Sequence, residues 1–460
     1  MSSMLEECAT LLGPQGILTG NDVASRVVGF GSEQPTQARA ILRPCSTDEV
    51  AACLRYCHTV GQSVVPHGGI TNLVQSAHTE PSDVVLSLER MNRIEEVDAI
   101  GRTMTVQAGV PLQIVQQEAK KQELMFPVDL GARGSCQIGG NVSTNAGGNR
   151  VIRYGMTRDN VLGLEAVLAD GTVISSLNRM IKNNAGYDLK HLFIGTEGTL
   201  GIITRLVLRL REASVSENTA FVAFENFEKL AGFLKFIDRE LGGSLSAFEA
   251  MWNDFYRLVT TPPAKTTPPL AQDYPYYVLV ESLGGDQASD SIRFQTAMER
   301  ALDAGYVADA VIAKSGTERT LMWGMRDDVE QLRQIFPTFN FDVSLAIKDM
   351  ESYLEELHTT LDSRWPNNRR VTFGHVGDGN LHFAIGIGDD SEEARLAVEK
   401  CVYEPLQAIN GSISAEHGIG LEKKDFLNLS RTATELDLML TLKKTLDPKG
   451  ILNPGKVFNS

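Results

Sequence analysis

The sequence predicts an α+β protein of two or three domains. Its 460 residues exceed what one hydrophobic core usually organises, since longer chains tend to divide into domains. Segments with strand and helix patterns alternate through the first half. After about residue 211 the helical segments become longer and carry acidic faces. This change of pattern places a domain boundary near that residue.

The first half contains the clearest local signals. Ser46 or Thr47 is expected to be the N-cap of a helix over 46–57, because acidic residues follow in its first turn. A second helix is expected over 111–121. Strands are expected over 63–66, 84–88, 103–108, 161–169 and 201–210.

The second half is predicted to continue with helices and strands. We expect helices over 224–241 and 286–304, and a strand over 276–281. The proline-rich stretch 260–269 is expected to be a loop inside a domain, because the same pattern continues on both sides.

Composition excludes several classes of protein. The net charge of −15 and the lack of a basic run argue against binding to nucleic acid or to an anionic membrane. No signal peptide and no apolar run long enough for an integral membrane segment is found in the sequence, so a cytoplasmic location is expected. The six cysteines are scattered without a zinc-type pair, which fits reduced thiols, and the spacing of Cys53 and Cys57 is typical of ordinary helix packing.

Two histidines flank a Gly-Asp-Gly-Asn turn in the segment 373–383. Folded as a hairpin with a four-residue loop, the segment would pair Val376 with Leu381 and His375 with His382. Directly paired residues share a face, about 5 Å apart at Cβ, so one metal ion could bind both imidazoles.

A second motif, Ser412 to Gly420, adds a carboxylate at Glu416 and a third histidine at His417. Two histidines and a glutamate leave metal positions open for water or substrate. A single histidine is more often a surface or core residue. However, three of the eight histidines lie in these two glycine-rich motifs.

Glycine-rich segments of the first half point to a different ligand. Residues 66–72 follow a strand, and 131–148 contain six glycines in eighteen residues, mixed with small polar residues. Glycine lets the backbone approach a ligand, and free N–H groups can cradle phosphate oxygens. For any one glycine pair a plain turn is the better interpretation, but together they favour a large dinucleotide-like ligand. No Gly-x-Gly-x-x-Gly opens a helix, so a Rossmann site is not supported.

In order along the chain, these motifs resemble the FAD-linked D-2-hydroxyacid dehydrogenases, a group that includes D-lactate dehydrogenases, D-2-hydroxyglutarate dehydrogenases and the glycolate oxidase flavin subunit. The motifs that carry the resemblance are Pro66–Gly69, Gly134–Gly148, Gly155, Gly195–Thr204, Gly374–His382, Glu416–Gly420 and Leu452–Lys456. The resemblance implies a two-part FAD-binding domain of the vanillyl-alcohol oxidase type. It also implies an α+β cap domain with an antiparallel sheet, and C-terminal helices that return to the flavin domain. The expected bounds are 1–212, 213–420 and 421–460.

The resemblance also implies roles for individual residues. His375, His382 and Glu416 resemble the metal ligands, for zinc or else manganese or iron; His417 resembles the catalytic base and Arg326 the clamp for the substrate carboxylate. FAD is expected to be noncovalent, because His67 precedes the glycine pair rather than following it. The residues expected to contact FAD are Pro66, His67, Gly68, Gly69, Ile70, Thr71, Asn72, Leu130, Gly131, Ser135, Gly139, Asn145, Gly148, Gly155, Gly198, Ile203 and Asn453.

The implied reaction is the oxidation of a D-2-hydroxy acid to a 2-oxo acid. Electrons would pass to an electron-transfer flavoprotein, a cytochrome or a quinone system, and a homodimer is one assembly the chain could form. A metal-dependent hydrolase would leave the glycine-rich half unexplained. A flavin-binding subunit without catalysis would leave His417 unexplained.

The substrate is expected to have a short or apolar tail, with D-lactate as the simplest case and D-2-hydroxyglutarate or D-malate as the alternative. In the hydroxyglutarate branch of the family, a lysine precedes the aspartate of a Tyr-Asp-Val-Ser-Leu-like motif by two residues, and an asparagine follows the second metal-binding histidine by two. This chain has Asn340 and Ala384 at those positions. A buried second carboxylate without a cation would be costly.

Overall fold

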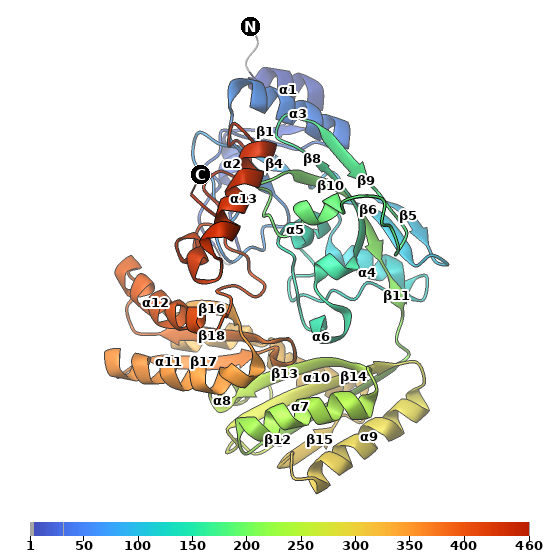
Figure 1. Cartoon of the computed structure of the whole chain (residues 1–460), viewed down its shortest axis with the longest axis vertical. Helices are drawn as coiled ribbons and strands as arrows, with labels where there is room; N and C mark the ends of the chain where they lie inside the picture. Colours follow the sequence, from blue (N-terminus) through green and yellow to red (C-terminus); the bar gives the residue numbers. More distant parts are fainter. Residues whose placement is uncertain (1–3, 31, 460) are drawn as a thin grey trace. The chain divides into compact units, whose positions relative to one another are not determined.

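The structure, a computed structural model, describes residues 4–30 and 32–459 (Figure 1). The chain forms two compact units. Unit 1 contains residues 1–148, 155–213 and 416–460, and unit 2 contains residues 149–154 and 214–415. The units differ from the expected domain bounds in three places: residues 149–154 belong to unit 2, while residue 213 and residues 416–420 belong to unit 1.

Unit 1 carries one mixed sheet and one antiparallel sheet. The mixed sheet has the order β1 (Ile17–Leu18), β2 (Ala40–Leu42), β4 (Val84–Ser87), β3 (Val64–His67). The antiparallel sheet has the order β5 (Ile94–Asp98), β6 (Thr103–Gln107), β10 (Ile202–Arg209), β8 (Val161–Val167), β9 (Val173–Ser176). A short pair joins β7 (Leu124–Met125) and β11 (Arg211–Glu212).

The helical elements of unit 1 lie mainly between these strands in the chain. They are α1 (Met4–Leu12), α2 (Asn21–Ala24), α3 (Thr47–Val60), α4 (Leu112–Lys120), α5 (Ile138–Ser143) and α13 (Ala433–Leu446), with the short 3-10 turns η1 (Thr157–Asn160), η2 (Leu189–Leu192) and η6 (Lys424–Leu429). The expected N-cap of α3 is confirmed, since the Ser46 side chain accepts a hydrogen bond from Glu49 N.

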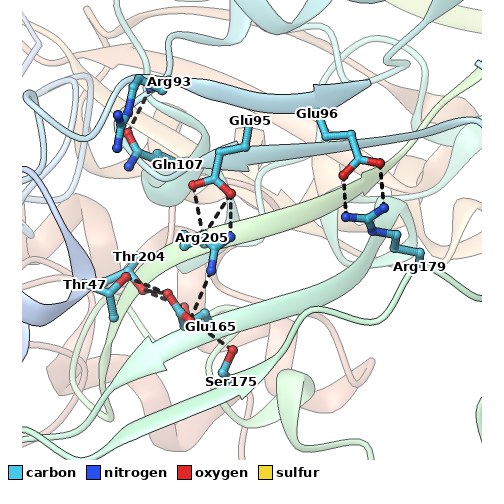
Figure 2. Close-up of polar contacts among 10 residues, drawn as sticks. All are labelled: Thr47, Arg93, Glu95, Glu96, Gln107, Glu165, Ser175, Arg179, Thr204 and Arg205. Carbon is cyan, nitrogen blue, oxygen red and sulfur yellow. Dashed lines mark hydrogen bonds and ion pairs between the residues drawn. The ribbon is translucent and has the colours of Figure 1, made fainter. Parts of the chain in front are cut away.

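One face of the antiparallel sheet is polar (Figure 2). Arg205 forms a two-pronged pair with Glu95, with its closest approach at 2.5 Å. The buried Glu165 accepts hydrogen bonds from Thr47 of α3 at 2.6 Å and from Ser175 of β9 at 2.9 Å. Exposed ion pairs on this face add little stability, but hydrogen bonds to a buried carboxylate fix α3 against the sheet.

A buried lysine holds the C-terminal segment of unit 1 in place. Lys443 Nζ donates to Thr199 O at 2.9 Å, to Asp447 Oδ2 at 2.6 Å and to Leu452 O at 2.7 Å. Beyond this point Leu452 forms a parallel bridge with Val64 of β3. The C-terminal segment therefore extends the mixed sheet.

Unit 2 is built on one antiparallel sheet. Its order is β15 (Asp309–Ile312), β12 (Ser216–Phe224), β14 (Tyr276–Gly284), β13 (Leu245–Trp252), β17 (Arg369–Gly374), β18 (Asn380–Gly386), β16 (Phe339–Ser344). Its helices are α6 (Val151–Tyr154), α7 (Phe227–Leu241), α8 (Asn253–Thr260), α9 (Gln287–Asp303), α10 (Gly316–Asp327), α11 (Met350–Arg364) and α12 (Glu392–Ala408), with the 3-10 turns η3 (Val329–Ile335), η4 (Ile347–Asp349) and η5 (Val376–Asp378).

Helices cover both faces of this sheet. On one face Phe233 of α7 packs against Phe248 of β13, with ring centroids 6.1 Å apart, and aromatic contacts place α11 and α12 on the same face. On the other face Phe255 of α8 stacks on Phe373 of β17 at 4.2 Å. The second face also carries α10 and the polar side chains described below.

The predicted register of the β17–β18 hairpin is wrong. Phe373, not His375, lies opposite His382, and Val376 does not pair with Leu381 because it begins the 3-10 turn η5. The two histidines are nevertheless close, with ring centroids 5.4 Å apart and an interplanar angle of 81°.

The physical reason for the different register is a longer turn. The carbonyl of His375 accepts hydrogen bonds from Asp378 N at 3.0 Å and from Asn380 N at 3.2 Å. Gly374 lets this turn fold back, since a Cβ there would lie 2.4 Å from Asn380 O. The strand ladder therefore ends before His375, and the imidazoles meet across the end of the hairpin.

Replacing Lys443 with methionine is expected to destabilise the chain by roughly 3–5 kcal/mol, because Asp447 would remain buried without its cation. The free energy of unfolding, measured by urea denaturation, checks this. Lys444→Met changes an exposed lysine of the same helix and is expected to have little effect. Equal losses in the two variants would contradict the assigned role of Lys443.

Candidate functional site

Unit 1 contains a cavity with about 870 Å³ of empty space, its open mouth included. Three glycine-rich segments and the C-terminal segment line it. The predicted cofactor residues on its wall are Pro66, His67, Gly68, Gly69, Ile70, Thr71, Asn72, Gly139, Gly198, Ile203 and Asn453.

The loop after β3 presents backbone donors to this cavity. In the described part of the chain, the N–H groups of residues 68–71 have no protein acceptor. Ile70 has a left-handed backbone conformation, with φ of 55°. Across the cavity Gly140 faces open space, since a Cβ added there would have no heavy atom within 4 Å. Successive free N–H groups in such a turn form a concave site for anionic oxygens.

Among the residues that the structure describes, three buried amide oxygens on the cavity wall have no hydrogen-bond partner. They are Gln137 Oε1, Asn141 Oδ1 and Asn453 Oδ1. A buried acceptor without a hydrogen bond is costly, so each is suited to a donor group of a bound ligand. Sequence reasoning missed Gln137 and Asn141, although they lie between the glycines that it singled out.

Contacts within the protein account for the presence of His67 and Gly69 at their positions. His67 Nε2 donates to Ala77 O at 2.9 Å, and burial lowers the pKa of His67 to about 4. The imidazole is therefore neutral at pH 7. A Cβ at Gly69 would lie 2.0 Å from Ser135 O, so this glycine is required by a close backbone approach rather than by a ligand.

The remaining predicted cofactor residues do not line the cavity. They are Leu130, Gly131, Ser135, Asn145, Gly148 and Gly155. Asn145 Oδ1 accepts a hydrogen bond from Arg158 N at 2.9 Å. Gly148 N donates to the Glu416 carboxylate. The structure therefore gives Asn145 and Gly148 contacts within the protein.

Glu197 positions the loop that follows Glu416 in unit 1. Its carboxylate accepts hydrogen bonds from Ile419 N at 2.6 Å and from Gly420 N at 3.0 Å. Burial raises the pKa of Glu197 above its ordinary value, which the two N–H groups partly oppose. Asn453 Nδ2 donates to Glu197 O at 2.7 Å, so the same residue also fixes an amide of the cavity wall.

In unit 2, a buried carboxylate joins two of the predicted site residues. Glu249 of β13 accepts a hydrogen bond from Arg326 Nε at 2.7 Å through one oxygen, and it contacts His375 Nδ1 at 2.6 Å through the other. All three residues are buried. Burial alone would raise the pKa of Glu249, but His375 and Arg326 together hold it below its ordinary value.

This contact fixes the orientation of the His375 ring. With Nδ1 directed at Glu249, Nε2 is left as the acceptor nitrogen, and Arg326 Nη2 lies 3.4 Å from it. A carboxylate behind a histidine is the arrangement that commonly orients metal ligands. Glu249 was missed from the sequence, where it is one acidic residue in an apolar strand.

His382 has an acidic neighbour of its own. Asp342 of β16 lies directly opposite it in the ladder, and His382 Nδ1 is 3.8 Å from Asp342 Oδ1. Asp342 is fully buried; it accepts hydrogen bonds from Asn380 Nδ2 at 2.9 Å and from Ala415 N at 3.0 Å. Two imidazoles and an adjacent carboxylate are donor groups suited to a divalent transition metal.

The two positions from which the sequence predicts the substrate lie directly opposite each other in the sheet. Asn340 of β16 lies opposite Ala384 of β18, one same-face step along from the pair of Asp342 and His382. Asn340 is exposed and Ala384 is buried. The remaining predicted residues, Glu416 and His417, belong to unit 1.

Two family models match the chain. The "FAD binding domain" model matches residues 38–176, and the model for "FAD linked oxidases, C-terminal domain" matches residues 214–457. In the described residues, no helix has the length and apolar character needed to cross a bilayer.

Curated relatives cover nearly the whole chain. A D-2-hydroxyglutarate dehydrogenase of Xanthomonas citri pv. viticola is 40% identical over 92% of this chain and 89% of its own length. That of Stutzerimonas stutzeri (strain A1501) is 34% identical over 99% of both chains. The mitochondrial enzyme of Bos taurus is 39% identical over 92% of this chain and 77% of its own length.

Solved structures confirm the predicted fold. p-Cresol methylhydroxylase with substrate bound has a TM-score of 0.78 at 14% identity, covering 99% of this chain and 96% of that one. An alkyldihydroxyacetonephosphate synthase has a TM-score of 0.77 at 16% identity, covering 98% of this chain and 84% of that one. At such identities the likeness concerns the fold alone.

Acidification is expected to destabilise unit 1 through His67. The pKa of His67 is about 4 in the folded chain, against an ordinary value of 6.5, so between these values the unfolded chain binds the proton and the folded chain does not. Stability is then lost as pH falls from about 6.5 to about 4, by roughly 3 kcal/mol.

Urea unfolding over this pH range measures the loss. His67→Gln keeps a donor for Ala77 O but cannot titrate, so its stability is expected to fall less than that of the unaltered chain. His358, whose pKa burial also lowers to about 4, remains in both proteins and cancels in the comparison. Identical pH profiles for the two proteins would contradict the assignment.

Proposed function

The chain belongs to the FAD-dependent D-2-hydroxyacid dehydrogenases of the FAD-linked oxidase family, and we propose that its substrate is D-2-hydroxyglutarate, which it oxidises to 2-oxoglutarate. The observation that carries the proposal is the buried cluster in unit 2, where the Arg326 guanidinium and the His375 imidazole share one carboxylate. The sequence alone favoured a D-lactate-like substrate. The named relatives, 34–40% identical, instead favour hydroxyglutarate.

FAD is the cofactor of this family, and the cavity in unit 1 fits it. The open N–H groups of residues 68–71 suit the pyrophosphate, and the unpartnered oxygens of Gln137, Asn141 and Asn453 suit polar hydrogens of the ring systems. When bound, FAD would supply the acceptor for the hydride that the substrate loses. We propose noncovalent binding, since His67 is buried and donates to a backbone carbonyl.

The metal ligands in this proposal are His375, His382 and Glu416. Glu249 holds the His375 ring by Nδ1, so Nε2 is the ring nitrogen that could bind a metal. Asp342 lies beside His382. Glu416 directly follows Ala415, whose N–H is bound by Asp342, and consecutive Cα atoms are about 3.8 Å apart. A divalent ion, most simply zinc, would act as a Lewis acid on the substrate hydroxyl.

The protein supplies a clamp and a base. Arg326 is buried with its Nε bound to Glu249, so its outer nitrogens, of which Nη2 also contacts His375, can donate to a carboxylate of the substrate. His417 takes the hydroxyl proton as general base, next in sequence to the ligand Glu416. Electrons then leave to an electron-transfer flavoprotein, a cytochrome or a quinone system rather than to oxygen.

Valine at Gly140 is expected to fill the cavity and lower the FAD content of the purified protein at least tenfold, because Gly140 faces open space on the wall. Gly131→Val is the matched control: that glycine also has open space around it but does not line the cavity. Equal loss of FAD from both variants would contradict the assignment of Gly140 to the cavity wall.

Acid precipitation of the unaltered protein is expected to release yellow flavin into solution. Colour kept in the pellet would contradict noncovalent binding.

Alanine at His382 is expected to remove the metal and most turnover while FAD stays bound, because flavin and metal contact different segments. Metal content by elemental analysis and flavin absorbance check this. His417→Ala is the contrasting variant: it is expected to keep both cofactors and to lower kcat by roughly 10²–10⁴, the usual contribution of a positioned base. Full activity in a metal-free preparation would contradict the proposed role of the metal. A change confined to KM in His417→Ala would make His417 a binding residue rather than the base.

The kcat/KM for D-2-hydroxyglutarate is expected to exceed that for D-lactate at least tenfold in assays with a dye acceptor. Asn340→Lys adds a cation beside the pair of Asp342 and His382 and is expected to lower KM for hydroxyglutarate without lowering that for lactate. The kcat/KM values for D-malate and D-2-hydroxybutyrate are measured in the same assay. A higher kcat/KM for lactate would overturn the substrate proposal but leave the reaction class intact.

A further inference from the structure

Sulfur atoms from two helices of unit 1 meet in one place. Met4 and Cys8 lie four residues apart on α1, and Cys53 and Cys57 lie four residues apart on α3. Residues four apart share a helix face, and α1 packs against α3 (Figure 1), so each helix presents a sulfur pair to the other. This cluster of Met4, Cys8, Cys53 and Cys57 is separate from the flavin cavity and from the cluster in unit 2.

Two separations within the sulfur cluster, both to Met4, match those around one metal ion. Met4 Sδ is 3.7 Å from Cys8 Sγ and 3.9 Å from Cys57 Sγ. A metal–sulfur bond of about 2.3 Å places ligand atoms about 3.8–4.0 Å apart in tetrahedral or trigonal geometry. Cys53 shares a buried apolar cluster with Cys8, which brings the fourth sulfur near the same group.

The ligand types favour a soft ion. The three thiols are fully buried, and Cys8 and Cys53 share an apolar cluster with Leu12 and Leu42. Thiolate and thioether ligands together select Cu(I). Met4 is only partly buried, so the thioether lies on the side from which an ion could enter.

We propose that Met4, Cys8 and Cys57 bind one Cu(I) ion, with Cys53 as the adjacent fourth sulfur. On binding, the thiols of Cys8 and Cys57 each lose a proton to solvent and form a copper–sulfur bond, while the Met4 thioether donates a lone pair. No electron is transferred, since copper enters and stays as Cu(I). The site is independent of the oxidation of the hydroxy acid.

The test is a competition titration of the full-length, FAD-containing protein, reduced and free of oxygen, against the Cu(I)–bicinchoninate complex. One equivalent of Cu(I) is expected to move to the protein, with a new ultraviolet band from thiolate-to-copper charge transfer. Because two protons are displaced, the affinity is expected to rise up to roughly 100-fold per pH unit.

Substitutions in the sulfur cluster test whether the Cu(I) ion binds there. Cys8→Ser and Cys57→Ser are each expected to weaken Cu(I) binding more than the roughly 10–100-fold that loss of a supporting contact costs at metal sites. Met4→Leu conserves volume, so packing survives and only the thioether is lost; roughly tenfold weaker binding is expected. Retained FAD absorbance reports that each variant is folded.

Cys401→Ser and Cys45→Ser remove thiols outside the cluster and are expected to leave Cu(I) binding unchanged. If the unaltered chain withdraws no Cu(I) from bicinchoninate, the proposal is overturned. It is equally overturned if a folded Cys8→Ser or Cys57→Ser variant binds as tightly as the Cys401→Ser protein, since copper would then lie elsewhere.

Discussion

The arrangement of unit 2 depends on the Glu249 carboxylate, buried in the middle of the sheet. Transferring a charge into the protein interior is costly, and this charge is tolerated because one oxygen binds Arg326 at 2.7 Å and the other meets His375 at 2.6 Å. Each partner is oriented by the contact: the guanidinium directs its outer nitrogens away from Glu249, and the imidazole keeps Nε2 as an acceptor, 3.4 Å from Arg326 Nη2. Replacing Glu249 with a neutral residue would leave both partners without the charge that positions them.

The cavity of unit 1 offers uncharged donors to a ligand, in contrast to the buried ion pair of unit 2. In the described residues, no lysine or arginine lines its cavity, so an anionic ligand would rely on backbone N–H groups and side-chain amides. Fixed N–H groups cost little conformational entropy when a ligand binds, because the sheets and short helices already hold them. Because the chain has a net charge of −15, affinity for anions cannot come from a general positive field. It has to come from these local uncharged donors.

A carboxylate in each unit anchors the chain around Glu416 and His417. In unit 2, Asp342 accepts a hydrogen bond from Ala415 N, the last residue before the crossing. In unit 1, Glu197 accepts from Ile419 N and Gly420 N just after it. The short segment between these anchors carries the proposed base and the proposed third metal ligand, so its backbone is restrained within a few residues on both sides.

The sequence by itself determined the features that arise from local interactions. The capped helix α3, the strand β3 with its Gly-Gly loop, and the glycine-rich segment before Gly148 all follow from turn chemistry, capping and periodicity within a few residues. The fold class followed as well, because the ordered motifs span nearly the whole chain. Turn chemistry also located the paired histidines, although it gave the wrong register.

Only the tertiary structure decided which distant residues became partners. Glu249 lies 126 residues before His375, and strand pairing places Asp342 opposite His382 and Asn340 opposite Ala384. The unpartnered oxygens of the cavity likewise exist only because several segments bury them together. Contacts of this kind depend on sheet order and burial, which no local pattern encodes, and a one-residue shift in register would reverse the face of every side chain.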